Sequence, residues 1–292
     1  MIPAEFEYLA PKNLEEALRM VERHGDEAKL LAGGHSLLPI MKLRLSAPRY
    51  VIDLGRIKSL RSISEDAGDL VIGALTTHHE METSELVKKR WPLLAETAAE
   101  IGDVQVRNRG TVGGSLAHGD PAADYPAAMV ALNAEIVAVS GTGTRKIRAE
   151  EFFVDLLTTQ LRPDEIITEI RVPASSQPSG CAYRKLHQPA SGFALVGVAV
   201  QVTLDSAGKL DALAIGVTGV AVRAYRARPA EVVLIRNKPT PKLISAASEK
   251  VADGIEPLAD LHASAAYRRS VASVYTRRSL EAAISRANER KA

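Results

Sequence analysis

Residues 106–124 read VRNRGTVGGSLAHGDPAAD, and residues 31–39 read LAGGHSLLP. Each stretch carries adjacent glycines, Gly33-Gly34 and Gly113-Gly114, close to hydroxyl side chains. Glycine lets main-chain N–H groups approach an anion because no Cβ stands in the way, and a row of such groups forms a phosphate-binding nest. A single glycine pair is most often a tight turn. Two pairs favour one dinucleotide pyrophosphate as a common ligand, although spacing alone does not show that the loops converge.

Neither stretch fits the Walker A pattern or the Gly-x-Gly-x-x-Gly fingerprint, so a P-loop or Rossmann assignment is excluded. The segment Gly34-His35-Ser36 is not a nucleophile elbow either, because that pattern requires glycine at the position of Leu38. The glycine pairs therefore belong to another kind of nucleotide site.

Upstream of the second stretch, apolar residues from Leu14 to Val21 follow the spacing of an amphipathic helix. Asn13 is expected to cap this helix, with Glu16 completing a capping box, and Gly25 to end it. Short strands are expected at 29–31 and 50–53. The first 55 or so residues thus predict a small α/β unit.

The pattern then changes toward antiparallel structure. A hairpin is expected from strands at 60–64 and 70–73, a helix at 92–101, and strands at 134–139 and 166–172.

A Pro- and Ser-rich segment at 173–180 is the clearest linker, so we place a domain boundary near residue 176. Beyond it, alternation at 196–204 and 213–217 predicts half-buried antiparallel strands. Helical patterns follow at 243–251 and 267–287. We expect an α+β fold with domains at 1–176 and 177–292.

The composition excludes several classes of protein. A net charge of +2 without long basic runs argues against a nucleic-acid binder. The single cysteine, Cys181, cannot form a disulfide within the chain or hold an iron–sulfur cluster alone. No signal peptide and no apolar run of membrane-span length is evident. We expect a cytoplasmic protein, with any association with the inner face of the membrane made through partners.

The two glycine-rich stretches resemble the paired flavin loops of the medium subunit of aerobic carbon monoxide dehydrogenases. The same loops occur in quinoline oxidoreductase, related molybdenum hydroxylases and xanthine dehydrogenase. The resemblance extends along the whole chain, including the opening segment 3–8 and the strand at 51–54. It implies a two-lobed FAD-binding domain of the vanillyl-alcohol-oxidase (PCMH) type over 1–176. It also implies a smaller C-terminal α+β domain with a three-stranded antiparallel sheet.

The resemblance also implies which residues hold FAD. The two loops match those around the pyrophosphate and ribityl chain, and further positions match contacts to the nucleotide and flavin. The implied cofactor-binding residues are Ala32, Gly33, Gly34, His35, Ser36, Thr111, Gly113, Gly114, Ser115, Asp124, Leu161, Lys185 and Phe193.

Some of these residues have a plainer alternative. Asp124 fits a helix N-cap as well as a nucleotide contact, and Leu161 fits ordinary core packing. Phe193 matches an aromatic position over the isoalloxazine ring, where relatives often have Tyr, but a buried core Phe is an equal alternative.

The histidines indicate no metal site. His78 and His79 are adjacent and so point apart on a helix, and His118 with Asp120 lacks further ligands. Histidines in similar loops of the wider fold attach FAD covalently, but the resemblance implies non-covalent FAD beside His35.

The resemblance finally implies a complex in which this chain contributes no catalytic acid, base or nucleophile. A large subunit would hold a molybdenum cofactor and a small subunit two [2Fe-2S] clusters, as a dimer of heterotrimers. Electrons would reach this FAD and leave to a quinone, oxygen or NAD. Carbon monoxide is the first expected substrate, followed by xanthine-like, N-heterocyclic and aldehyde substrates. Rival interpretations are a self-contained flavoprotein oxidase and a flavin-free interaction protein.

Overall fold

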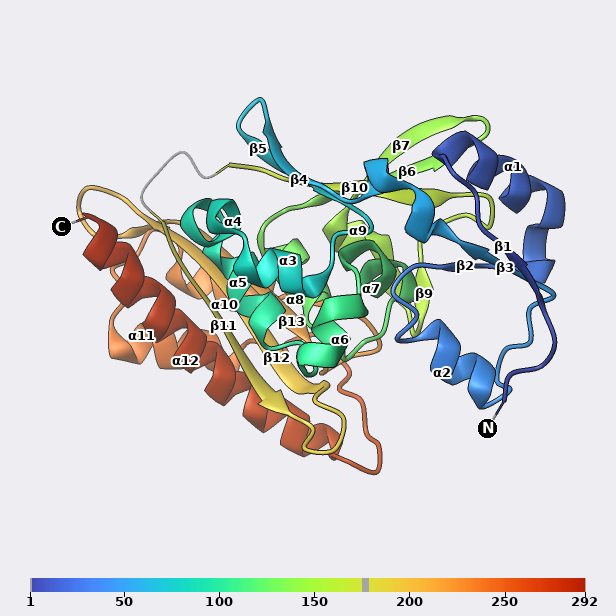
Figure 1. Cartoon of the computed structure of the whole chain (residues 1–292). Helices are drawn as coiled ribbons and strands as arrows, with labels where there is room; N and C mark the ends of the chain where they lie inside the picture. The colour runs from blue at the N-terminus through green and yellow to red at the C-terminus, as the bar shows by residue number, and fades with distance from the viewer. Residues whose placement is uncertain (1, 175–178, 292) are drawn as a thin grey trace.

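The computed structural model describes residues 2–174 and 179–291, and the molecule is organised around three sheets (Figure 1). The N-terminal lobe is a parallel sheet in the order β1-β3-β2, with helix α1 between its first two strands in sequence. Its bounds are β1 (Glu7–Leu9), α1 (Leu14–His24), β2 (Ala28–Leu31) and β3 (Tyr50–Asp53). The expected α/β unit is confirmed.

Helix α1 begins and ends where the sequence predicts. The Asn13 side chain accepts the N–H of Glu16 at 2.9 Å, and Gly25 ends the helix at φ +49°. The Glu16 carboxylate, however, accepts the N–H of Lys12 at 2.7 Å rather than that of Asn13. The Glu16 half of the expected capping box therefore bonds to the residue before the N-cap instead of to the N-cap itself. Ala17 and Val21 are buried, as the amphipathic spacing requires.

The second sheet is antiparallel, in the order β4-β5-β10-β6-β7. The hairpin begins later than expected, because Leu60 lies in a short 3-10 helix and not in a strand. The strand Gly143–Arg148 was not predicted, since its polar, mostly exposed residues carry no alternation. The strands are β4 (Ile63–Asp66), β5 (Asp69–Gly73), β6 (Glu135–Ser140), β7 (Gly143–Arg148) and β10 (Ile166–Val172).

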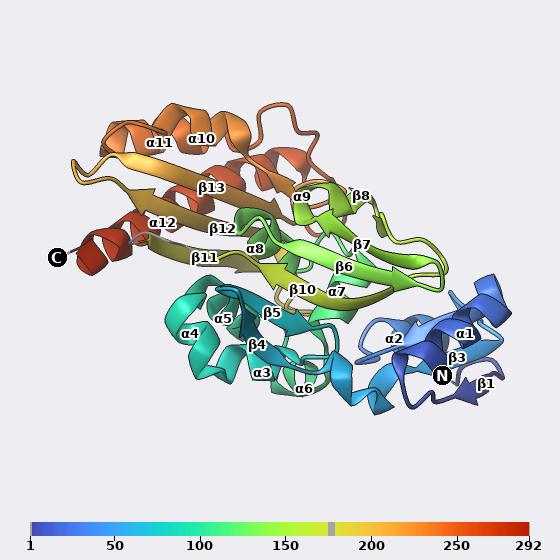
Figure 2. The same ribbon diagram turned by 90° about the horizontal axis from the view of Figure 1, so that it is seen from above.

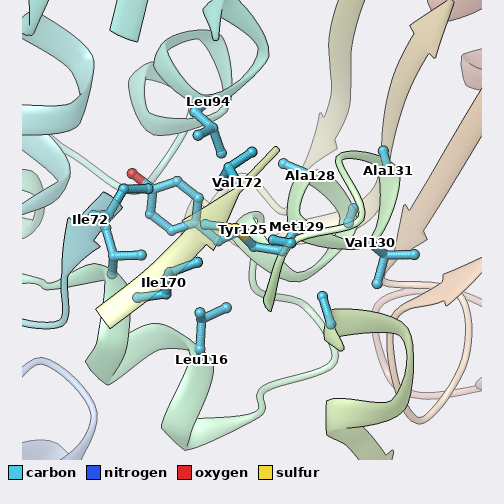
Figure 3. Close-up of a cluster of buried hydrophobic side chains, with 14 of the residues drawn as sticks. Ile72, Leu94, Leu116, Tyr125, Ala128, Met129, Val130, Ala131, Ile170 and Val172 are labelled. Atoms are coloured by element: carbon cyan, nitrogen blue, oxygen red, sulfur yellow. The ribbon is translucent and has the colours of Figure 1, made fainter. Parts of the chain in front are cut away.

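Helices α5, α7 and α8 pack in the middle of the molecule against two of the sheets. Tyr125 of α8 is fully buried, with Ile72 of β5 and Ile170 of β10 in the same apolar cluster (Figure 3). The central helices are α3 (His78–Thr83), α4 (Glu85–Arg90), α5 (Pro92–Ala99), α6 (Val104–Arg109), α7 (Val112–His118), α8 (Tyr125–Ala131) and α9 (Ala149–Phe152). Shorter elements are α2 (Leu37–Lys42), β8 (Phe153–Asp155) and β9 (Thr158–Thr159).

The C-terminal sheet is an antiparallel meander of β11 (Ser179–His187), β12 (Ala194–Leu204) and β13 (Leu210–Thr218). A fourth strand of two residues, β14 (Tyr225–Arg226), joins the three long ones expected. Figure 2 shows helices α10 (Arg228–Leu234), α11 (Pro241–Glu249) and α12 (Ala265–Lys291) gathered around this sheet. The expected domain boundary near residue 176 lies outside the described residues.

Two glycines allow helices to approach this sheet closely. A Cβ on Gly180 would stand 1.9 Å from the carbonyl oxygen of Ala283 in α12, and a Cβ on Gly216 would stand 1.9 Å from that of Ala127 in α8. The C-terminal sheet is thus held between α12 and the central helix α8. Across residues 2–174 and 179–291, no helix combines the length and apolar character needed to cross a bilayer.

Candidate functional site

A cavity of about 560 Å³ lies between the N-terminal lobe and the central helices. Its walls come from the segment after β2, from α6 and α7, from the residues just before and at the start of α3, and from the loop before β12. All the residues named as cofactor-binding from the sequence line the cavity, except Lys185. The structure therefore brings together residues that lie up to 161 positions apart in the chain.

The two glycine loops converge, which spacing could not show. A Cβ on Gly33 would stand 2.3 Å from the carbonyl oxygen of Arg109 and 2.8 Å from the Cα of Gly110. Farther along, a Cβ on Gly114 would lie 3.7 Å from the Cβ of Ala32. Main chain meets main chain here, so neither loop has room for a side chain at the point of contact.

The first loop provides free main-chain donors. Within the described residues, no protein atom accepts the N–H groups of Gly33, Gly34, His35 or Ser36. Gly34 adopts φ +80°, the left-handed region in which glycine carries no steric penalty. Successive free N–H groups beside a cavity suit a phosphate oxygen.

The second loop offers a different surface. Val112 and Gly113 donate to the carbonyls of Thr76 and Ala74, both at 2.9 Å, and Gly114 donates to Thr111 Oγ1 at 3.1 Å. These N–H groups are thus already engaged at the start of α7. The loop's free contribution is its hydroxyl groups and a side-chain-free face, because a hydroxyl that accepts one bond still donates another.

Asp124 is buried at the edge of the cavity and is held by two partners. Its carboxylate accepts the Tyr183 hydroxyl at 2.6 Å and the Lys185 ammonium at 2.9 Å. Asp124 occupies the N-cap position of α8, as the alternative interpretation from the sequence expects. Its side chain, however, makes no capping hydrogen bond. Burial raises the pKa of the Asp124 carboxyl, and the adjacent Lys185 ammonium opposes that rise.

Lys185 lies behind the cavity wall rather than in it. Its ammonium also donates to the carbonyl of Glu100 at 2.8 Å, and its side chain is fully buried. Within this pair, Lys185 fixes the orientation of Asp124 rather than facing the cavity itself. The sequence did not indicate Tyr183, whose hydroxyl completes the set of groups around Asp124.

The two apolar candidates differ in burial. Leu161 is half-buried, packs against the main core cluster and lines the cavity, so its position fits both core packing and a contact to a ligand. Phe193 is 45% exposed and lines the cavity, so it is not a core residue. Its ring is available to a ligand.

His78 is a cavity residue that sequence reasoning missed. It is 5% exposed, its Nδ1 has no hydrogen-bond partner, and its ring centroid lies 5.3 Å from that of Tyr125. Burial lowers the pKa of His78 to about 4, so the ring is neutral near neutral pH. The Thr77-x-x-Glu80 capping box, present in the structure, was the available signal that a helix starts at His78.

Among residues 2–174 and 179–291, the remaining histidines form no metal centre. His35 and His118 line the cavity, while Asp120 accepts the N–H of Ala122 at 2.8 Å. In the described part of the chain, no group of three or more His, Cys, Asp or Glu side chains is arranged to hold a metal ion.

These features fit a flavin dinucleotide. The free N–H row suits a pyrophosphate, and the same cavity also contains the aromatic ring of Phe193. The contact between the loops leaves no intruding side chain. This fold and site define a class of flavoproteins in which a two-lobed FAD-binding domain is followed by a smaller α+β domain.

Comparison with known proteins agrees with that class. Residues 4–175 match the family model for the FAD-binding domain in molybdopterin dehydrogenase, and residues 181–283 match that for the CO dehydrogenase flavoprotein C-terminal domain. The chain belongs to the family of FAD-binding medium subunits of molybdenum hydroxylases, which includes those of carbon monoxide dehydrogenase and xanthine dehydrogenase.

Individual relatives span the chain almost completely. The carbon monoxide dehydrogenase medium chain of Hydrogenophaga pseudoflava is 42% identical, over 98% of this chain and 99% of the relative. Subunit alpha of the 6-hydroxypseudooxynicotine dehydrogenase complex of Paenarthrobacter nicotinovorans is 38% identical, over 100% and 98%. Among solved structures, carbon monoxide dehydrogenase from Hydrogenophaga pseudoflava matches with a TM-score of 0.95 at 43% identity, covering 98% of this chain and 99% of that one. Quinoline 2-oxidoreductase from Pseudomonas putida 86 matches with a TM-score of 0.92 at 32% identity, covering 98% and 99%.

Proposed function

We propose that this chain, a flavoprotein subunit of a molybdenum hydroxylase, passes the electrons of its complex to an external acceptor. We further propose that the complex is a dimer of heterotrimers. A small subunit with [2Fe-2S] clusters would reduce its FAD, and a large subunit would hold the molybdenum cofactor. The observation that carries the proposal is the convergence of the two glycine loops on one cavity. Residues 1–176 would form the domain that binds FAD. Residues 177–292 would form the domain that closes the cavity through Phe193.

The chain's own residues would bind and orient FAD without covalent attachment. The free N–H groups of residues 33–36 would receive the pyrophosphate, with the hydroxyls of Thr111 and Ser115 beside them. Asp124, fixed by Lys185 and Tyr183, would accept a nucleotide hydroxyl, and Phe193 would lie against the isoalloxazine ring. When bound, FAD supplies the exchange of electrons between the clusters and an acceptor.

Carbon monoxide is the substrate that we propose first for the complex, because two relatives named as carbon monoxide dehydrogenase medium chains align over nearly the whole chain. Relatives named for nicotine 6-hydroxylase and glyceraldehyde dehydrogenase align over 94% of it, which supports N-heterocycles and aldehydes as the alternative. The electrons would leave to an external acceptor such as a quinone.

Flavin reduction in the isolated chain and in the complex tests this function. Dithionite should bleach the FAD of the isolated chain, and carbon monoxide or nicotine should not. Co-expression with the cluster and molybdenum subunits should yield a complex in which the substrate bleaches the flavin. Bleaching by substrate in the isolated chain would instead identify a self-contained oxidase. Acid precipitation should release the flavin into the supernatant, and flavin retained in the pellet would assign covalent attachment to His35.

A further inference from the structure

A second cavity, of about 380 Å³, adjoins the first. The two cavities share Asp120, Ser191 and Phe193, so the half-exposed Phe193 ring stands in a wall common to both. The rest of the second cavity comes mainly from the start of β12 and the loop that precedes α12, with further residues from the loops before α8, between β8 and β9, before β12 and after β13, and from α12 itself. A volume of this size falls within the roughly 300–1,000 Å³ typical of small-molecule sites.

Arg268 holds the walls of this second cavity in place. Its guanidinium is 4% exposed and donates to the carbonyls of Leu195 and Gly219, at 2.7 and 2.6 Å. It also donates to the Asp260 carboxylate at 2.6 Å. One buried side chain thus joins β12, the end of β13 and the loop before α12. Such bracing pre-forms a concave site rather than leaving three loose segments.

The lining combines apolar side chains with a few polar groups that can donate hydrogen bonds. Leu156, Phe193, Leu195 and Leu258 supply apolar surface. The Gln188 side-chain oxygen accepts the Ser191 hydroxyl at 2.8 Å, which orients its amide nitrogen as a donor. His262 adds an imidazole to the lining. An apolar slot with amide and imidazole donors matches a flat, uncharged ring that carries carbonyl oxygens.

The charges in the cavity argue against a phosphate-bearing occupant. Asp120 and Asp260 are both acidic, and the two terminal nitrogens of Arg268 are already engaged by three acceptors, while its Nε is buried without a partner. A dinucleotide such as NAD would bring two phosphate charges beside two carboxylates, and the one guanidinium in the lining is already paired with Asp260. A neutral ring meets no such penalty.

We propose that this second cavity is the docking site of the external electron acceptor and that the acceptor is a quinone. The inference rests on the proposed function, since it places the acceptor on the far side of Phe193 from the FAD cavity. The reaction balances as FADH₂ plus quinone giving FAD plus hydroquinone, with two electrons and two protons transferred. The protein's part is to hold the quinone ring against the Phe193 wall and to donate hydrogen bonds to its carbonyl oxygens.

The test fills the second cavity without touching the first. Ala259 is exposed and lines only the second cavity, so Ala259→Trp places an indole there. Ala207→Trp is the matched control, because Ala207 is equally exposed but lies in the β12–β13 turn, roughly 33 Å along β12 from the cavity at about 3.3 Å per residue. Calorimetric titration of the oxidised, FAD-loaded chain with 1,4-naphthoquinone measures binding directly, without turnover.

We expect saturable binding of one naphthoquinone, weakened at least tenfold in Ala259→Trp and unchanged in Ala207→Trp, with equal FAD content in all three proteins. Reoxidation of the dithionite-reduced flavin by naphthoquinone should slow by the same factor in Ala259→Trp. Equal quinone affinity in both variants would overturn the assignment, and so would NAD binding that Ala259→Trp abolishes. A chain that holds no FAD would refute the proposed function, whereas the quinone titration of that flavin-free chain would still test the second cavity.

Discussion

The carbonyl oxygen of Arg109 lies 2.3 Å from the place where a Cβ would stand on Gly33. The two glycine loops therefore touch through their main chains, although Arg109 and Gly33 are 76 positions apart. This contact sets the free N–H groups of the first loop beside the start of α7. The geometry of the proposed pyrophosphate site thus depends on the absence of one methyl group.

Gly33→Ala should separate the loops, because the obstructing atoms are main chain and cannot rotate away. We expect a loss of about 1–3 kcal/mol in the free energy of unfolding, typical of overpacking, and FAD binding weakened roughly tenfold or more. Urea unfolding and flavin content measure both effects. Gly141→Ala is the control, since its Cβ would meet nothing nearer than a Glu22 carboxylate oxygen at 3.8 Å. Full FAD occupancy in Gly33→Ala would show that the loop contact does not matter to the cofactor.

Gly114→Val should remove FAD with little change in the fold. Gly114 does not adopt a positive φ, so backbone strain is not the reason. A Cβ there would stand 2.7 Å from Thr111 Oγ1, the hydroxyl that caps α7, and the branched side chain would cover the loop's open face. Circular dichroism should remain native while the flavin absorbance is lost. A variant that keeps stoichiometric FAD would make this loop purely structural.

The features that the sequence predicted well were those with a local physical cause. Alternating apolar residues predicted β12 and β13, and Asn13 and Gly25 marked the ends of α1. By contrast, the sequence pattern did not locate β11, the third strand that the resemblance implied, because its first five residues are all buried and leave no alternation.

The candidate site was predictable only through resemblance. The glycine pairs indicated a phosphate site, but the contact between Gly33 and Arg109 is a tertiary fact that spacing does not encode. The position of Lys185 behind Asp124, instead of in the cavity, depends on how β11 packs against the central helices. His78 was judged only as half of a metal pair, although its burial follows from the helix that begins there.

Lys185→Met should leave the Asp124 carboxylate buried without its counter-ion. Breaking such a pair costs about 3–5 kcal/mol in unfolding free energy, and the pKa of Asp124 should rise further because the ammonium no longer opposes the effect of burial. Lys146→Met, at an exposed pair with Glu135 of 3.4 Å, should cost about 1 kcal/mol or less. Adding Asp124→Asn to Lys185→Met should recover part of the stability. Equal losses in Lys185→Met and Lys146→Met would contradict a buried pair.

Neutral His78 should make the free energy of unfolding depend on pH. Burial lowers the pKa of His78 from 6.5 to about 4 in the folded chain, so between these values the unfolded chain binds the additional proton. Stability from this group is therefore complete above pH 6.5 and is lost as the pH falls toward 4, by roughly 3 kcal/mol in all. Urea unfolding of the FAD-free chain near pH 7 and at about pH 4.5 measures the loss. His78→Gln should flatten this part of the profile, whereas His79→Gln, at the exposed neighbour, should leave it unchanged. A profile as steep in His78→Gln as in the parent chain would assign the pH dependence to other groups.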